Sequence, residues 1–336
     1  MEVTGKSCVP VTSASVVRHY ANNFLSHGAT IERLLETAGI CPEYLDVPDA
    51  VVPLDNAYRF AELACHSLQT QHLGLHVGLA SSPADFGRYG RGLLTTTTLG
   101  EYLARAAALF NALTSGERLW LSEHGTRIGV NISSPGDVGL GMYQSHLGTM
   151  AVTLKVCREV MGPSWSPDEI GFAYRSREKL PYCDLFAESR IQFGLPHSFI
   201  MIPRSAMALR LPQKLQYPCD GDSQLIPLLP ASLVGLAEKQ IEAFIAEGRR
   251  FHIESVAESL AISKRALQRA IGGEGLTYSQ LVAETRLRRA IFWLDHSDKP
   301  VTEIALELGY TEGSNFTRAF RRRTGMSPSA FRQAAS

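Results

Sequence analysis

The C-terminal third of the chain contains an internal repeat, and this repeat narrows the folds open to the region more than any other feature. Residues 256–263 (VAESLAIS) align with residues 304–311 (IALELGYT) at a constant offset of 48 positions. Each copy predicts a short helix with apolar residues at i, i+1 and i+4, followed by a turn at Ala261 or Gly309. The Ser or Thr that ends each copy is suited to N-cap a following helix. Each copy therefore predicts a helix, a turn and the start of a second helix.

The second helix repeats as well, because residues 267–271 (LQRAI) match residues 316–320 (FTRAF) at an offset of 49 positions. The second helix of a helix-turn-helix unit enters the major groove of DNA, with its N-terminal polar side chains toward the base edges. The side chains predicted to face outward are Lys264, Arg265, Gln268 and Arg269 in the first unit and Ser314, Thr317, Arg318 and Arg321 in the second. These faces are also typical of a solvated helical bundle, but two copies with matching turns, caps and basic faces favour DNA binding.

The segment between the two copies predicts a long connecting helix, from about residue 278 to residue 295. Held rigidly, such a helix would place both second helices in successive major-groove segments, about 34 Å apart. Lys299-Pro300 breaks it, and Thr302 is the predicted start of the next unit. The net charge of zero averages two unequal parts: residues 249–336 carry 14 Lys and Arg against 9 Asp and Glu, so only this part suits a polyanion.

Length and composition limit the number of domains and the class of protein to which the chain can belong. A chain of 336 residues with 45% hydrophobic and 20% charged residues predicts two globular domains. The six cysteines show no C-x-x-C spacing, which favours reduced thiols over a metal site or a disulfide framework, and we expect no cofactor. No apolar run has membrane-spanning length and residues 1–10 lack the pattern of a signal peptide, so we expect a cytoplasmic protein without membrane contact.

Residues 304–332 (IALELGYTEGSNFTRAFRRRTGMSPSAFR) closely resemble the signature of the AraC/XylS family of transcription regulators, and SKRALQRAI and ETRLRRAIFWL upstream extend the likeness. The resemblance implies that base-facing positions fall on Arg265, Gln268 and Arg269 in the first unit, and on Gly313, Ser314, Thr317 and Arg318 in the second. Gly313 departs from the pattern, since it has no side chain to read a base. Arg322 and Arg323 are candidates for phosphate contacts without sequence preference.

The N-terminal region predicts an α+β order with helices first. The expected elements are helices at 15–26, 31–38, 54–68, 99–113 and 138–161, a hairpin of strands 117–122 and 126–132 around the turn 123–125, and strands near 169–174 and 198–202. After residue 223 a linker turns into a helix beyond Pro230, which we expect to open the DNA-binding domain. No catalytic signature of nucleotide-binding, metalloprotease or hydrolase type is found in this region.

Parts of the stretch from Ile40 to Gly100, together with residues 193–207 (FGLPHSFIMIPRSAM), resemble the N-terminal effector domain of an AraC subgroup that includes regulators of amino-acid and amine catabolism. The resemblance implies a domain that senses a small metabolite and differs from the jelly roll of other members. Candidate ligand contacts are Trp120, Tyr143 and His146, from a pocket between hairpin and helix, and Arg88 and Arg91, as a carboxylate clamp. Core packing and surface exposure are the more common roles for residues like the first three, and a solvated loop explains the two arginines equally well.

Taken together, the sequence predicts a ligand-sensing and dimerising domain at 1–225 and a DNA-binding domain at 226–336, with helix-turn-helix units at about 254–274 and 302–324. The predicted function is a sequence-specific, effector-responsive activator of a catabolic or metabolic operon, acting as a homodimer with promoter DNA, a metabolite (an amino acid or amine) and RNA polymerase as partners. The alternatives are a repressor, an enzyme fused to a DNA-binding module, and an architectural protein without an effector.

Overall fold

The structure is a computed structural model that describes residues 9–25, 31–45, 47, 50–136, 139–175, 183–186, 188–215, 229–230, 232–249 and 251–335. It divides into two compact units, an N-terminal unit formed by Pro10–Asp46 with Val52–Leu229 and a C-terminal unit formed chiefly by Pro230–Ser336. Cys8, Cys219, the predicted helix ends at Ser26 and Val138, and the predicted linker residues 223–228 lie outside the described residues.

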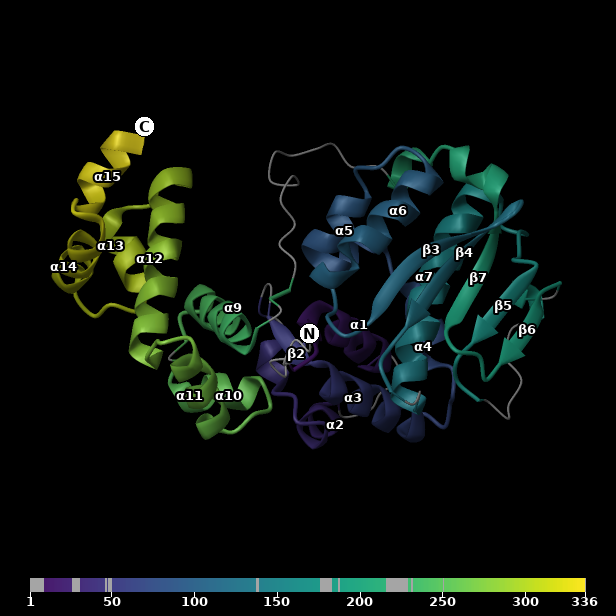
Figure 1. Cartoon of the computed structure of the whole chain (residues 1–336), viewed down its shortest axis with the longest axis horizontal. Helices are drawn as coiled ribbons and strands as arrows, with labels where there is room; N and C mark the ends of the chain where they lie inside the picture. The colour runs from purple at the N-terminus through teal and green to yellow at the C-terminus, as the bar shows by residue number, and fades with distance from the viewer. Residues whose placement is uncertain are drawn as a thin grey trace, which may run out of the picture. The chain divides into compact units, whose positions relative to one another are not determined.

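The N-terminal unit combines helices with a mixed β-sheet (Figure 1). Its helices are α1 (Ala14–Leu25), α2 (Glu32–Thr37), α3 (Leu54–Ser67), α4 (Leu73–Ala80), α5 (Gly87–Leu93), α6 (Leu99–Leu109), α7 (Leu140–Met161) and α8 (Cys183–Phe186). Short 3-10 segments lie at Pro42–Tyr44, Pro83–Phe86, Phe110–Ala112, Arg204–Ala208 and Gln213–Leu215. The strands are β1 (Val11–Ser13), β2 (Val51–Pro53), β3 (Arg118–His124), β4 (Arg127–Ser133), β5 (Glu169–Phe172), β6 (Arg190–Phe193) and β7 (Ser198–Pro203).

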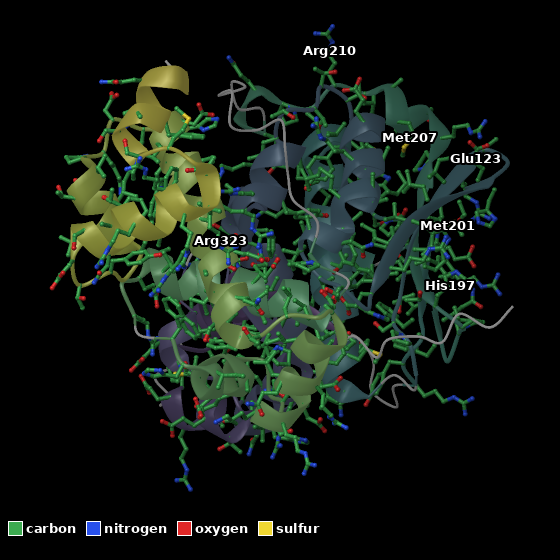
Figure 2. The ribbon with its side chains drawn as sticks, turned by 60° about the vertical axis from the view of Figure 1, so that its left-hand side comes forward. Glu123, His197, Met201, Met207, Arg210 and Arg323 are labelled. Atoms are coloured by element: carbon green, nitrogen blue, oxygen red, sulfur yellow. The ribbon has the colours of Figure 1, made fainter. Side chains whose placement is uncertain are left out.

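Five strands form one sheet in the order β3-β4-β7-β5-β6, and β1 pairs with β2 separately. All neighbours in the large sheet run antiparallel except β5 and β6, which run parallel. Because side chains alternate between the faces of a strand, each strand contributes to both sides of this sheet. The pairing of Trp120 with Asn131, and of Asn131 with Phe199, places Trp120 on the same face as Met201. The Trp120 ring lies 5.1 Å from that of His197, and Figure 2 labels His197 and Met201.

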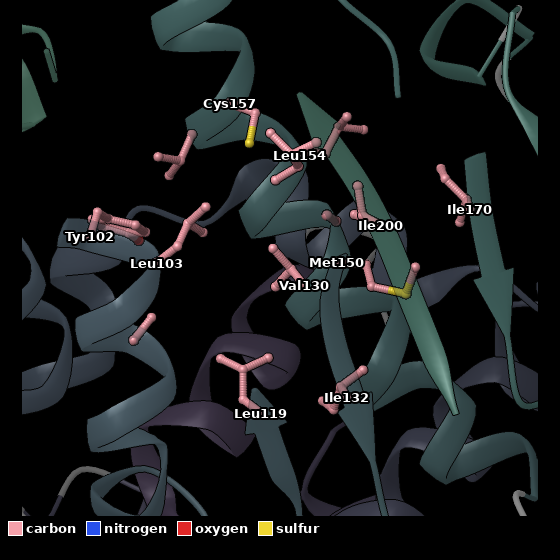
Figure 3. Close-up of a cluster of buried hydrophobic side chains, with 14 of the residues drawn as sticks. Tyr102, Leu103, Leu119, Val130, Ile132, Met150, Leu154, Cys157, Ile170 and Ile200 are labelled. Carbon is pink, nitrogen blue, oxygen red and sulfur yellow. The ribbon is translucent and has the colours of Figure 1, made fainter. Parts of the chain in front are cut away.

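The opposite face of the sheet carries the main hydrophobic core (Figure 3). The core side chains labelled there come from α6, α7 and four strands, namely Tyr102, Leu103, Leu119, Val130, Ile132, Met150, Leu154, Cys157, Ile170 and Ile200. Helices α6 and α7 cover this face, and α3 and α4 pack against α7 (Figure 1). The expected α+β order is thus confirmed.

The hairpin turn differs from the prediction. Strand β3 continues through His124, so Glu123 and His124 are strand residues and the two-residue turn is Gly125-Thr126. Gly125 adopts a positive φ of 63°, a conformation that glycine reaches without steric cost and that tight hairpin turns require. The antiparallel pairing of β3 with β4 continues to the pair His124–Arg127, so Glu123 and His124 both belong to the ladder.

Six helices and strands of the N-terminal unit were not predicted, namely α4, α5, α8, β1, β2 and β6. Helix α4 has the sequence LGLHVGLA, in which apolar residues are spread around the helix, and five of its eight residues are buried. An amphipathic period indicates a helix with one polar face, and this sequence has no such period. Strand β6 lies at the sheet edge beside β5 and has only half-buried and exposed side chains, so its sequence lacks a clear alternation.

The C-terminal unit is all helical in its described residues (Figure 1). Its helices are α9 (Leu233–Ala246), α10 (Ile253–Ser259), α11 (Lys264–Gly273), α12 (Tyr278–His296), α13 (Val301–Glu307), α14 (Gly313–Thr324) and α15 (Pro328–Ala335). Helices α10 and α11 form the first helix-turn-helix unit, α13 and α14 form the second, and α12 is the long helix between them. Helix α13 begins at Val301, one residue before the predicted start at Thr302.

Candidate DNA-binding surface and effector cavity

The first recognition helix, α11, is amphipathic and capped. The Ser263 side chain accepts a hydrogen bond from the Ala266 backbone N–H, which satisfies one of the free amides at the helix start. Leu267 and Ile271 are buried against the unit, and the side chains of Lys264, Arg265, Gln268 and Arg269 are all exposed on the other side. Lys264 Nζ lies 2.6 Å from Glu254 Oε1 of α10, so this lysine ties the two helices of the unit together.

The second recognition helix, α14, has a different start from the one predicted. Its N-cap residue is Glu312, which makes no side-chain capping bond, so Thr311 does not occupy the capping position that the repeat predicts. The extra residue in the second copy moves the helix start on by one position. Phe316 and Phe320 anchor the buried side of α14, whereas Arg318 is exposed.

Polar side chains on α14 bond within the helix. Arg318 Nη2 donates to Asn315 Oδ1 at 2.6 Å, and Thr317 Oγ1 donates to the Gly313 carbonyl at 2.9 Å. Ser314 Oγ donates to Glu312 Oε2 at 3.2 Å. A base contact by any of these groups must replace or share an existing hydrogen bond, and this costs free energy. Arg265, Gln268 and Arg269 make no such bonds to other side chains of the described residues, so a base contact by them does not carry this cost.

Arg286, on α12, links the two helix-turn-helix units. Its guanidinium carbon lies 5.1 Å from the ring centre of Phe251, just before α10, and 4.9 Å from that of Tyr310, in the turn before α14. Its Nη2 atom also donates to the Gly309 carbonyl at 3.4 Å. A planar cation held between two aromatic rings resists rotation of either helix-turn-helix unit about α12. With 19 residues, α12 is about 28 Å long at the usual rise of 1.5 Å per residue.

A cavity lies inside the N-terminal unit, among α1, α3, α4, α5, α6, α7 and the hairpin of β3 and β4. Its volume is about 110 Å³, taken as the space in which the centre of a water molecule fits. Most lining residues are apolar, such as Val17, Leu103 and Val152. The lining residues that carry polar side-chain groups are Thr12, His19, Tyr20, Tyr58, Ser81, Tyr89, Tyr102, Thr114, Glu117, Ser145, Thr149 and Thr153. An apolar cavity with a few polar groups is the usual form of a small-molecule site.

Glycines on α7 let the walls of this cavity approach closely. A Cβ atom at Gly141 would lie 2.1 Å from the Tyr58 carbonyl oxygen on α3, a distance that backbone cannot accommodate. Because α3 meets α7 at this point, the Tyr58 hydroxyl comes within 2.7 Å of Glu117 Oε1. The close helix contact therefore positions a polar side chain at the cavity wall.

Glu117 accepts three hydrogen bonds, all from hydroxyl groups. Oε1 accepts from Tyr58 at 2.7 Å and from Ser134 Oγ at 3.2 Å, and Oε2 accepts from Ser145 Oγ at 3.1 Å. Burial raises the pKa of the Glu117 carboxyl, and the three hydrogen bonds oppose that rise. Burial, followed by the nearby Glu117 charge, also raises the pKa of the Tyr58 hydroxyl well above its usual value.

Comparison with models of known protein families shows which family this chain belongs to. Residues 28–211 match the model of the arabinose-binding domain of AraC transcription regulators at their N-terminus, and residues 256–334 match a helix-turn-helix domain model. The first match alone covers more than half of the chain. The chain belongs to the AraC family of transcription regulators.

Relatives of this AraC-family regulator span nearly the whole chain. The ornithine utilization regulator of Pseudomonas aeruginosa is 26% identical over 314 residues, which cover 92% of each chain. The regulator VqsM of the same organism is 25% identical over 77% of this chain and 83% of its own. Among solved structures, the transcriptional regulator CdpR of P. aeruginosa aligns with a TM-score of 0.43 and 17% identity, over 95% of this chain and 98% of its own. Family membership makes the chain a DNA-binding transcription regulator, which decides against the enzyme alternative.

The five ligand contacts predicted from the sequence do not line the cavity. Trp120 lies on the sheet face away from the core, 5.2 Å below the Arg118 guanidinium and 5.1 Å from the His197 ring. Tyr143 is fully buried in the core, where its ring stacks on Tyr174 at 4.4 Å. Leu119 and Val130 of the hairpin and Ser145 of α7 do line the cavity, so a pocket lies between the hairpin and this helix as predicted, but the five predicted residues are not part of its wall.

Arg88 and Arg91 are exposed on α5, whose inward face contributes Tyr89 and Leu93 to the cavity wall. His146 is buried and is connected to the Glu117 carboxylate by two hydrogen bonds, through the Ser134 hydroxyl. Its Nε2 atom is 2.9 Å from Ser134 Oγ, the same hydroxyl that donates to Glu117. His146 is thus placed to support Glu117 through Ser134.

The positions of the protons in the hydrogen-bond network of Glu117, Ser134, His146 and Ser198 can be assigned from the groups that take part. Ser134 donates to the Glu117 carboxylate, so the His146 Nε2–H donates to Ser134 and the neutral Nδ1 accepts from Ser198 Oγ at 3.0 Å. Burial lowers the pKa of His146 to about 4, which agrees with a neutral ring. The resulting series of hydrogen bonds joins α7 to β7 and ends at Glu117 in the cavity wall.

Glu117, Tyr58 and Ser145 are the site residues that sequence reasoning missed. Glu117 was predicted as the first residue of a strand, and nothing in its neighbours along the chain shows that it is buried. Within the described residues, no group of three or more His, Cys, Asp or Glu side chains is arranged to hold a metal ion. None of the described helices has the length and apolar content needed to cross a membrane.

Proposed function

We propose that this protein is an effector-responsive, sequence-specific transcription activator. The C-terminal unit, from about residue 226, would bind promoter DNA, and residues 1–225 would sense a small metabolite and form the homodimer. The observation that carries the DNA-reading part is the repeated helix-turn-helix unit, with basic and amide side chains exposed on α11 and α14 and both units attached to α12. Action on chromosomal DNA and on RNA polymerase assigns the protein to the cytoplasm.

Base reading is proposed to come mainly from the first unit. Arg265 and Arg269 suit bidentate bonds to guanine, and Gln268 suits adenine. The second unit would contribute through Ser314, Thr317, Arg318 and Arg321, with Gly313 allowing close approach of the backbone and Lys264 supporting the first unit. Because Gly313 has no side chain and three polar groups of α14 already bond locally, the first half-site should dominate specificity.

The test uses the full chain and a duplex selected from a random-sequence pool. Arg269→Ala and Arg318→Ala should each weaken binding to that duplex by about 1 to 3 kcal/mol, with a smaller effect on unrelated DNA. Arg322→Ala is the matched control, since Arg322 is an exposed arginine of the same helix as Arg318 that we assign to phosphate. This control should weaken all DNA equally and lower the slope of log K against log salt by about 1. Unchanged affinity in both of the first two variants would reject the assignment.

The effector response rests on the cavity of the N-terminal unit. A metabolite that binds one arrangement of the regulator more tightly shifts the population toward that arrangement, and so toward productive binding of DNA. Expression of a promoter-reporter fusion with and without the gene, in the presence of metabolite pools, separates activation from repression. Sedimentation of the full chain with and without DNA tests the homodimer. A regulator that stays monomeric on its duplex contradicts that part of the proposal.

A further inference from the structure

The Glu117 carboxyl group is unusually placed for an acidic side chain. Only 5% of the residue is exposed, and it lines the cavity just before β3, next to a wall that is mostly apolar. Buried carboxylates in proteins are normally paired with a cation, because moving a charge out of water is costly. Within the described part of the chain, no Lys or Arg side chain lines this cavity, and Glu117 makes no ion pair there.

The hydrogen bonds to Glu117 leave room for one more donor. A carboxylate offers about four acceptor positions, two on each oxygen. Tyr58 and Ser134 both donate to Oε1, whereas Oε2 accepts only from Ser145 among the described residues. Ser145 and Tyr58 both line the cavity, and Oε2 is the oxygen that has the smaller number of donors.

The other groups of the wall do not supply a charge that opposes Glu117. His19 is the one histidine among the described lining residues, and burial lowers its pKa, which favours the neutral ring. Tyrosine, serine and threonine hydroxyls make up the remaining polar groups. The wall therefore combines one acidic group with hydroxyls and a large apolar surface.

We propose that this cavity binds a small organic cation, with its ammonium group donating to Glu117 Oε2 and its apolar part against Val17, Leu103 and Val152. The inference rests on the proposed effector response and names the chemical class of the effector. An ammonium group would supply the missing donor and the opposing charge together, as a charge-assisted hydrogen bond. A neutral ligand of the same shape would leave the buried carboxylate unpaired, and an anionic one would be repelled by it.

The experiment compares three probes of one chain length on the full-length wild-type protein at about pH 7.5. The probes are n-hexylamine, which is cationic, 1-hexanol, which is neutral, and hexanoate, which is anionic. Their affinities are measured by isothermal titration calorimetry without DNA. We expect hexylamine to bind at least about tenfold more tightly than hexanol, and hexanoate more weakly than both. Equal binding of amine and alcohol, preferred binding of hexanoate, or no binding of hexylamine at 10 mM would overturn the proposal.

Glu117→Gln keeps the size of the side chain and removes its charge. In this variant the preference for hexylamine over hexanol should disappear, and hexanol affinity should change little. Glu123→Gln is the matched control, because Glu123 is an exposed carboxylate near the hairpin tip (Figure 2), and it should keep the preference. A preference that survives in folded Glu117→Gln overturns the assignment of Glu117. Should that variant fail to fold, the three-probe comparison on the wild-type protein still decides, because equal binding of hexylamine and hexanol there overturns the proposal.

Failure of this inference can be told apart from failure of the proposed function. Loss of the amine preference, combined with a reporter that still responds to added metabolites, rejects only the cation and keeps the effector response. Tight binding of hexylamine to a protein whose DNA binding and reporter output never change keeps the cavity assignment and rejects the proposed effector response.

Discussion

The turns of the two helix-turn-helix units offer a reciprocal test of the repeat. Ala261 and Gly309 occupy equivalent positions, and both adopt a positive φ, of 51° and 77°. The left-handed conformation costs an L-residue about 1 to 2 kcal/mol relative to glycine. The first unit therefore bears a strain that the second avoids, and exchanging the two residue types should have opposite effects on the two units.

The expected changes in stability for the two substitutions follow from the structure. Ala261→Gly removes the strain but adds about 0.4 to 1 kcal/mol of unfolded-chain entropy, so the first unit should gain about 0.5 to 1 kcal/mol. Gly309→Ala introduces the strain, and its Cβ would lie 3.0 Å from Arg286 Nη2. Moving that guanidinium weakens its contact with Tyr310, so the second unit should lose about 1 to 2 kcal/mol.

Hydrogen exchange of the full chain, followed by mass spectrometry, measures each unit separately. A change of about 1 kcal/mol in opening free energy corresponds to about a fivefold change in exchange rate. Ala261→Gly should slow exchange in α10 and α11, and Gly309→Ala should accelerate it in α13 and α14. Gly313→Ala is the control within the second unit, since a Cβ there meets no atom within 4 Å and its φ is not positive. Changes of the same sign in both test variants would refute the reasoning from turn conformation.

Three further predictions follow from single contacts. Ser263→Ala should cost about 1 kcal/mol of local stability in α11 by removing the cap, whereas Thr311→Ala should leave exchange in α14 unchanged; equal effects would contradict the different helix starts. Arg286→Ala should weaken binding to a duplex with both half-sites more than to one half-site, and a uniform loss in fluorescence anisotropy would argue against its linking role. The folded-state pKa of His146, about 4, lies below its unfolded value, so the unfolded chain takes up the proton first and stability falls as pH decreases from about 6.5 toward 4. At about pH 5.5 this group should cost about 1.4 kcal/mol, so thermal unfolding of wild type should be more sensitive between about pH 7.5 and 5.5 than that of His146→Gln.

Local signals were sufficient for the DNA-binding unit. The helices, the turns and the outward-facing side chains of α11 and α14 follow from apolar spacing, capping residues and a repeated glycine or alanine, all within about twelve residues of one another. The family resemblance rested on the same residues, because its signature lies in these short segments. Where the prediction failed here, at Thr311, one extra residue in the second copy had moved the helix start.

Contacts across the chain decided what the sequence could not show. Helix α4 was missed because its apolar residues are spread around the helix, so it lacks an amphipathic period. Glu123 and His124 were placed in a turn because their pairing with β4 depends on the partner strand. The Lys264 ion pair with Glu254 depends on how α10 and α11 cross.

The candidate ligand site depended most on tertiary structure. Tyr58, Glu117 and Ser145 come from α3, the start of β3 and α7, and they are separated by 28 residues or more along the chain. The sequence by itself determined that this protein reads DNA with two helix-turn-helix units and that an α+β domain precedes them. Only the tertiary structure showed that Glu117 is buried at a cavity wall, because burial and the partners of a carboxylate depend on which distant segments pack around it.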